Sequence, residues 1–154
     1  MEVMGLSEFE RFFRAAASLD VDKEDLRRHN DFINRKIYDL LIIGQAKAKA
    51  NARDVIEDWD LPVTKGLQET IHDFRQMDEG SQLRPILEQL VALPELPPPG
   101  LNMTYSEELE RRLPGIAGGL SLALARTFKI LDPKLKNPQT EQWERAFRVF
   151  DLLL

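Results

Sequence analysis

Two histidines and one short acidic stretch are the side chains of this sequence best suited to acid–base or metal chemistry. His29 and His72 lie far apart in the chain, and neither has a second ligand-type residue at the spacing that metal sites use. We therefore expect surface or packing roles for both. The stretch Glu57 to Asp60 is acidic enough to attract a cation, but it lacks the glycine and the regular oxygen spacing of a calcium loop. Capping of a helix N-terminus is the expected role of these carboxylates.

The sequence contains no recognisable catalytic motif. Cysteine is absent, which excludes thiolate chemistry and disulfides. There is no phosphate-cradling glycine loop, no nucleophile elbow and no HExxH. The glycines between Gly115 and Gly119 fall inside a helical pattern, where they favour close helix packing. We therefore predict that the chain is not an enzyme and that it has no catalytic residues, no cofactor and no metal site.

Basic residues gather at two places that could contact nucleic acid. Arg11 and Arg14 lie one turn apart on a predicted first helix, and Lys47, Lys49 and Arg53 cluster near the end of a long helix. The second cluster also suits the negative end of the helix dipole. The whole chain has 21 Lys and Arg against 26 Asp and Glu, a net charge of −5. Because phosphate neutralisation supplies most DNA affinity, this balance lowers the expectation of DNA binding, although a local patch can act against it.

Apolar residues recur at three- and four-residue steps along most of the 154-residue chain, which predicts an all-α protein. The first half is expected to hold a short, a long and a short helix, over residues 7–19, 23–52 and 60–77. Ser7 and Glu10 have the spacing of a capping box, and Asp22 is a good N-cap for the long helix. Pro62 fits the first turn of the third helix, where a missing N–H does little harm.

The second half repeats this rhythm, with helices expected over residues 81–93, 107–131 and 138–154. A proline-rich break at 94–103 separates the first two, because consecutive prolines cannot continue a helix. Thr104 and Glu107 read as another capping box. Pro114 is expected to kink the long helix or to split off its first turns. Trp59 and Trp143 stand near the start of each third helix, where we expect both to anchor the core.

Two successive sets of short, long and short helices resemble a histone-fold pair joined in one chain. Histone-like proteins carry an arginine in the loop after the long helix and an aspartate seven residues later, and their salt bridge clamps the loop. Arg53 and Asp60 match this spacing, and Ile56 matches an apolar position that pairs one unit's loop with its partner's. The resemblance implies an all-α pseudo-dimer: one domain over 1–154, with a first motif at 7–78 and a second at 81–154.

The chain also resembles an uncharacterised bacterial family of doubled, single-chain histone folds. This likeness is carried by residues 66–70 (GLQET), 135–141 (LKNPQTE) and 149–154 (VFDLLL). Compared with DNA-binding histones, however, Asp20, Asp54 and Val55 stand where that resemblance implies basic or phosphate-binding residues. The second half has no clear counterpart of the arginine–aspartate clamp, although Lys134 and Glu141 have the spacing.

A protein-interaction or assembly module is the function that these features favour, with an unidentified protein partner or self-association. The alternative is a nucleoid-associated DNA-binding protein with a reduced set of phosphate contacts, namely Arg11, Arg14, Lys47, Lys49 and Arg53. No signal peptide is recognised, and the longest near-apolar run, 40–44, is far too short to cross a bilayer. We therefore expect a cytoplasmic protein without membrane contact.

Overall fold

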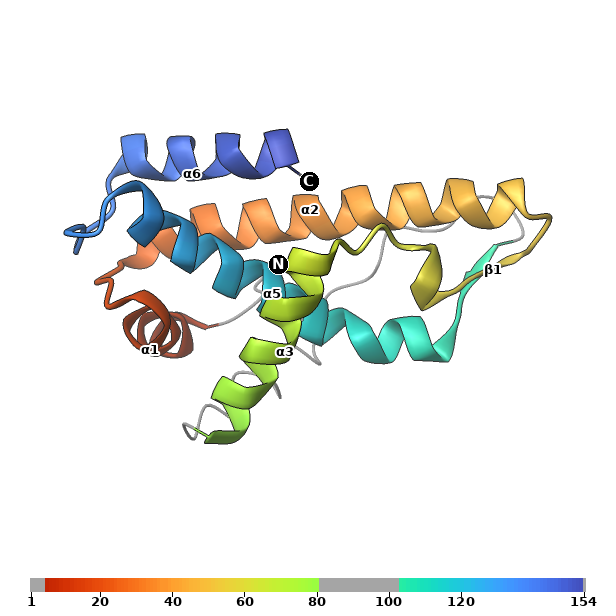
Figure 1. Cartoon of the computed structure of the whole chain (residues 1–154), viewed down its shortest axis with the longest axis horizontal. Helices are drawn as coiled ribbons and strands as arrows, with labels where there is room; N and C mark the ends of the chain where they lie inside the picture. Colours follow the sequence, from red (N-terminus) through yellow and green to blue (C-terminus); the bar gives the residue numbers. More distant parts are fainter. Residues whose placement is uncertain (1–4, 81–102, 154) are drawn as a thin grey trace.

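The computed structural model describes residues 5–80 and 103–153, which form a mostly helical protein (Figure 1). Its helices are α1 (Leu6–Ala17), α2 (Lys23–Ala50), α3 (Lys65–Gly80), α5 (Glu107–Leu131) and α6 (Thr140–Leu153), with a 3-10 turn η1 (Asp58–Asp60). Two short strands that the sequence did not predict, β1 (Val55–Ile56) and β2 (Thr104–Tyr105), pair in parallel. The helix predicted at 81–93 and nearly all of the proline-rich break lie outside the described residues. No helix in the described ranges is long and apolar enough to span a membrane.

The two helices of the N-terminal region begin in different ways. Asp22 caps α2 as predicted: its carboxylate accepts from the N–H of Asp25, and the Asp25 carboxylate accepts from the N–H of Asp22. The capping box predicted at Ser7 is wrong, because α1 already begins at Leu6 and Gly5 precedes it without a side-chain cap. The cap position falls outside the predicted motif, and Ser7 is left inside the first turn, where its hydroxyl donates to Glu8.

Helix starts in the rest of the chain also differ from the prediction by a few residues. Thr64, not Asp60, lies at the start of α3, where its hydroxyl accepts from the N–H of Leu67. Ser106, not Thr104, caps α5 and accepts from the N–H of Leu109, because Thr104 is used in β2. The α5 helix runs through Pro114 without being split. Thr64 and Ser106 thus make the capping hydrogen bonds because each lies nearer the first residue of its helix than the predicted cap.

Helix α5 forms the centre of the core and packs most closely against α3. A Cβ atom at Gly118 would lie 2.3 Å from the ring of Phe74, and one at Gly119 would lie 2.5 Å from Cγ1 of Ile71. The close helix packing expected from these glycines is therefore confirmed. Other helices cover α5 as well, since α1, α2 and α6 all contact it.

The two tryptophans occupy opposite environments. Trp143 is fully buried, with its ring centroid 4.7 Å from that of Phe128. Trp59 is 61% exposed, so its predicted role as a core anchor is wrong. It belongs to the turn η1, which holds the buried Leu61 against the core and leaves the indole of Trp59 outside.

The loops around the two long helices pair at both ends of the molecule (Figure 1). At one end the loop after α2 pairs with the loop before α5, in the register Val55 with Thr104 and Ile56 with Tyr105. At the other end the loop before α2 meets the loop after α5, where the N–H of Asp20 donates to the carbonyl of Lys136 at 2.7 Å. The loops at both ends of α2 are thus hydrogen-bonded to the loops at both ends of α5.

Candidate functional site

Arg53 and Asp60, the residues predicted to clamp the loop, form a bidentate ion pair. Arg53 Nη1 donates to Asp60 Oδ2 at 2.7 Å, and Nη2 donates to Oδ1 at 2.6 Å. The carboxylate of Asp60 is buried and also accepts from the N–H of Glu57 at 2.8 Å. The hydrogen bonds from Arg53 hold the pKa of Asp60 below its ordinary value, although burial opposes this shift. The pair fixes the segment that carries β1 and η1, and it occupies the guanidinium of Arg53.

Lys134 and Glu141, the pair with the same spacing in the second half, are both exposed and form no ion pair in the described part of the chain. Instead Gln142 Oε1 accepts from the N–H of Gln139 at 2.7 Å, just as Asp60 accepts from Glu57. Gln142 therefore makes the same local hydrogen bond as Asp60, but within α6 rather than in a turn ahead of the helix.

The other four cations considered for DNA contact are divided between two regions. Arg14 lies 3.7 Å from Asp20, and Lys47 Nζ donates to the carbonyl of Trp59 at 3.1 Å. Arg11 and Lys49 are exposed and form no ion pair within the described residues. Arg11 and Arg14 belong to α1, whereas Lys47 and Lys49 lie near the distal end of α2, on the other side of the molecule (Figure 1). The structure does not bring these cations and Arg53 together on one surface.

His29 is completely buried in a polar network between α2 and α5. Its Nε2 lies 2.9 Å from Ser121 Oγ, and its Nδ1 lies 3.0 Å from Asn30 Oδ1. Burial lowers the pKa of His29 to about 4. His72 is exposed on α3, and no cluster of three metal-binding side chains occurs among the described residues. Both histidines therefore have the packing and surface positions expected for them.

Asp25 is a second buried polar residue, which the sequence analysis did not single out. Trp143 Nε1 donates to Asp25 Oδ1 at 2.7 Å, and an Arg28 nitrogen lies 3.8 Å from the same oxygen. Burial raises the pKa of Asp25, and its hydrogen bonds only partly oppose this. In the sequence, the signal that could have indicated Asp25 was its position three residues after the cap Asp22, where a carboxylate completes a capping box. This contact joins α2 to α6.

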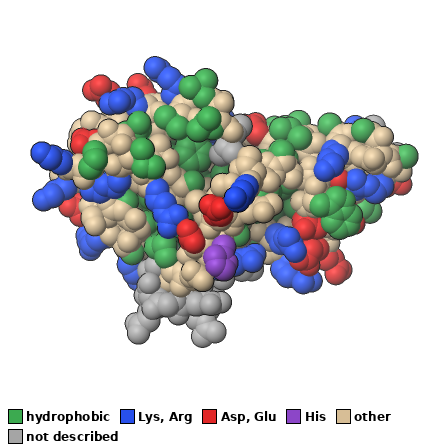
Figure 2. Space-filling view, in the orientation of Figure 1, with side chains coloured by type: hydrophobic (Ala, Val, Ile, Leu, Met, Phe, Trp, Pro, Cys, Tyr) green, Lys and Arg blue, Asp and Glu red, His purple; other side chains and the backbone are tan. Residues whose placement is uncertain are grey.

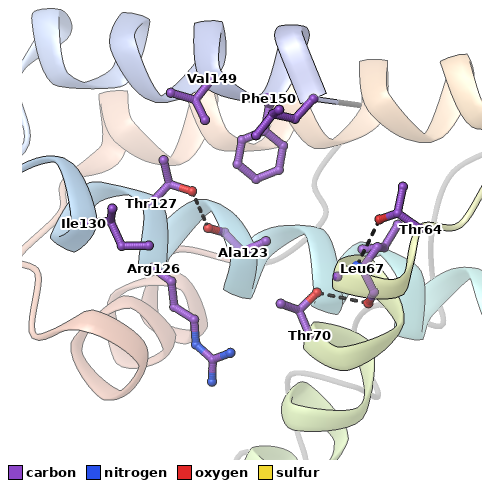
Figure 3. A pocket seen from close by; sticks show the side chains of 11 residues that line it. Thr64, Leu67, Thr70, Ala123, Arg126, Thr127, Ile130, Val149 and Phe150 are labelled. Carbon is purple, nitrogen blue, oxygen red and sulfur yellow. Dashed lines mark hydrogen bonds between the residues drawn. The ribbon is translucent and has the colours of Figure 1, made fainter.

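An apolar surface surrounds the C-terminal end of α6. Ile130, Leu152 and Leu153 are 79%, 80% and 74% exposed. Ile130 and Leu153 line a cavity of about 410 Å³ between α3, α5 and α6, into which Val149 and Phe150 extend from α6 (Figure 3). Figure 2 shows hydrophobic side chains gathered in this region. The signal in the sequence was the pair of leucines, Leu152 and Leu153, that follows the core residue Phe150 in the last turn of α6.

The chain is similar to several bacterial proteins over nearly its whole length. Two uncharacterised proteins of Aquifex aeolicus (strain VF5) are 25% identical over 147 residues, covering 96% of this chain and 82% of theirs, and 29% identical over 136 residues, covering 82% and 78%. A crystal structure of a protein from Thermus thermophilus has 53% identity and a TM-score of 0.81, and covers 99% of both chains. The crystal structure of protein AQ328 from Aquifex aeolicus has 25% identity and a TM-score of 0.78, and covers 96% of this chain and 94% of its own. The model of the family described as "Domain of unknown function (DUF1931)" matches residues 9–151, and the chain therefore belongs to that family.

Proposed function

We propose that this chain is a histone-like pair of helical units that acts as a non-enzymatic assembly module and associates with a second copy of itself. The two units pair within the chain, and copies associate through the apolar surface beside α6.

The reciprocal loop pairing supports the histone-like interpretation. A histone-fold unit cannot bury its core alone, and in a pair the loop before one long helix meets the loop after the other. Here the carbonyls of Asp54 and Lys136 accept from Thr104 and Asp20 at the two ends. Ile56, the position expected to pair the loops, is buried within β1. The loop before each long helix therefore contacts the loop after the other long helix.

The apolar surface at the end of α6 is the observation that carries the assembly function. Single exposed apolar residues are normal, but several exposed apolar residues around an apolar cavity are typical of an interaction site. Ile130 and Leu153 project from the patch, and they also line the neighbouring cavity. When two copies are related by a twofold axis, the projecting side chain of each copy can enter the apolar cavity of the other. This shape favours a second copy of the chain as the partner.

Salt bridges neutralise some of the charges beside the patch. Lys36 Nζ and an Arg35 nitrogen lie 2.6 and 3.7 Å from Asp151 Oδ1, and Arg126 lies 2.9 Å from Asp73. An approaching apolar surface then meets neutralised pairs at the rim, which cost less to desolvate than isolated ions.

DNA binding, the alternative expected from the sequence, has less support. Arg53 is held by Asp60, and Arg14 and Lys47 have neighbours of their own. Of the five cations considered, Arg11 and Lys49 remain available for phosphate contact, and they lie on separate helices. Each phosphate contact that is not made removes one counterion-release contribution to affinity.

Sedimentation velocity over a range of protein concentrations tests the assembly proposal. We expect the wild-type chain to form a dimer, and Ile130→Asp and Leu153→Asp to shift it to monomer because a charge would be buried in the interface. Leu6→Asp is the matched control, since Leu6 is an exposed apolar residue on α1. A wild-type protein that stays monomeric at high concentration contradicts the proposal. Sub-micromolar DNA binding with a steep salt dependence would favour the alternative instead.

A further inference from the structure

A second cavity, of about 500 Å³, lies between the η1 segment, α3 and α5, and differs in character from the apolar one. Apolar side chains form part of its lining, namely Leu61, Val63, Ile71 and Ile116. Polar and charged side chains complete it, among them Gln68, Arg75 and Arg112. The carboxylate of Asp58 also belongs to this lining, so the cavity is mixed in character, with charged groups beside the apolar ones. Convergent polar groups in a cavity of this size can fix the orientation of a small molecule.

Trp59 supplies an exposed aromatic face at this cavity. The backbone around it is fixed, because its own carbonyl accepts from Lys47 and the neighbouring Asp58 pairs with Arg112 at 3.0 Å. The indole is nevertheless 61% exposed. A rigidly held but exposed tryptophan loses little conformational entropy when a planar partner stacks on it.

Arg75 supplies a positive charge that no carboxylate neutralises within the described residues. Its guanidinium lies against α5 at Gly115, where a Cβ atom would come within 3.2 Å of Nη2 and 3.5 Å of Nε. Arg112 in the same cavity is different, because it is held between Asp58 and Glu108. The cavity therefore offers one positioned and uncommitted guanidinium.

We propose that this cavity binds a small molecule consisting of a planar aromatic ring that carries one anionic group. The ring stacks on the indole of Trp59, and the anion forms paired hydrogen bonds with the guanidinium of Arg75. The amide of Gln68 bonds to a polar atom of the ligand. A phosphate and a carboxylate both have this chemistry. The proposal is independent of the assembly function, because it concerns a different surface.

Titrations with matched probes test the site. AMP and naphthalene-1-carboxylate each carry a ring and an anion, whereas adenosine lacks the anion and inorganic phosphate lacks the ring. We expect AMP or the carboxylate to quench tryptophan fluorescence and to bind in calorimetry, and each half-ligand to bind at least about tenfold more weakly. Since Trp143 is buried, the quenching reports on Trp59. Binding of AMP alone identifies the anion as a phosphate, and binding of naphthalene-1-carboxylate alone identifies it as a carboxylate.

Three variants assign the contacts. Trp59→Ala and Arg75→Ala should each weaken binding about tenfold or more. Gly115→Ala should weaken it too, because the added methyl displaces the guanidinium, and it keeps both binding side chains. Gly66→Ala is the control, since the nearest atom to its Cβ is 4.0 Å away. The proposal is overturned if neither probe binds at millimolar concentration, if adenosine binds as tightly as AMP, or if Arg75→Ala leaves the affinity unchanged.

Discussion

Lowering the pH from neutral to 5 should destabilise this protein through His29. The imidazole is fully buried beside Ser121 and Asn30, and the rings of Phe9 and Phe13 lie 5.0 and 5.6 Å from it. Within the described part of the chain, no carboxylate pairs with this imidazole. The neutral form is therefore favoured in the folded state, and the unfolded chain has no such preference.

The size of the effect follows from the difference in pKa between the two states. The pKa of His29 falls from an ordinary 6.5 to about 4 on folding. Below pH 6.5 the unfolded chain binds a proton that the folded chain does not, so stability falls as the pH drops towards 4. At about 1.36 kcal/mol per pH unit, the free energy of unfolding decreases by about 2 kcal/mol at pH 5 and about 3 kcal/mol at pH 4. For a chain of this size, 2 kcal/mol corresponds to a Tm lower by roughly 4–8 °C.

Urea denaturation at a series of pH values measures this slope. His29→Gln keeps a neutral hydrogen-bonding group in place, so its stability should depend much less on pH between 6.5 and 5. His72→Gln is the matched control, because His72 is the other histidine of the chain and is exposed. Asp25 has a raised pKa and contributes with the opposite sign, but it is present in every variant and cancels in the comparison. Equal slopes for His29→Gln and wild type would refute the reasoning.

Two further substitutions test the packing around α5 and α6 by the same denaturation measurement. Gly119→Ala should lower the free energy of unfolding by about 3 kcal/mol, because its Cβ would lie 2.9 Å from the backbone nitrogen of Ile71 and α3 would have to move. Gly66→Ala is the control: its Cβ has open space, so the change should be neutral or should stabilise the protein by up to about 1 kcal/mol. Trp143→Phe should cost about 2 kcal/mol, because it removes the hydrogen bond of 2.7 Å to the buried carboxylate of Asp25, and a loss no larger than that of an exposed substitution would contradict this role.

Some features of the fold were predictable from a single local signal in the sequence. The cap at Asp22 and the close packing at Gly118 and Gly119 are of this kind, because the helix N-terminus and the missing Cβ act on their immediate surroundings. Where two signals competed, tertiary contacts decided. Thr104 has a capping sequence, but the parallel pairing with Val55 uses its backbone and leaves Ser106 as the cap.

The candidate sites were less predictable because they depend on distant pairs. Arg53 and Asp60 could be matched by spacing, since only a loop separates them. The contact between Asp25 and Trp143 joins residues 118 positions apart, and no local pattern indicates it. The cavity that includes Trp59 and Arg75 likewise depends on how α3 lies against α5. Trp59 and Trp143 look equivalent in the sequence, but only the structure distinguishes the exposed indole from the buried one.

A hydrogen bond from a backbone N–H to the side chain three residues later occurs both at Glu57 and at Gln139. In the first half a buried carboxylate accepts the N–H of Glu57 and requires Arg53 to balance its charge. At the start of α6 the neutral amide oxygen of Gln142 accepts the N–H of Gln139. A neutral acceptor avoids the desolvation of a charge, so no arginine is needed there. The same local hydrogen bond is thus formed in two ways, by a buried carboxylate that pairs with Arg53 in the η1 segment and by a neutral amide at the N-terminus of α6.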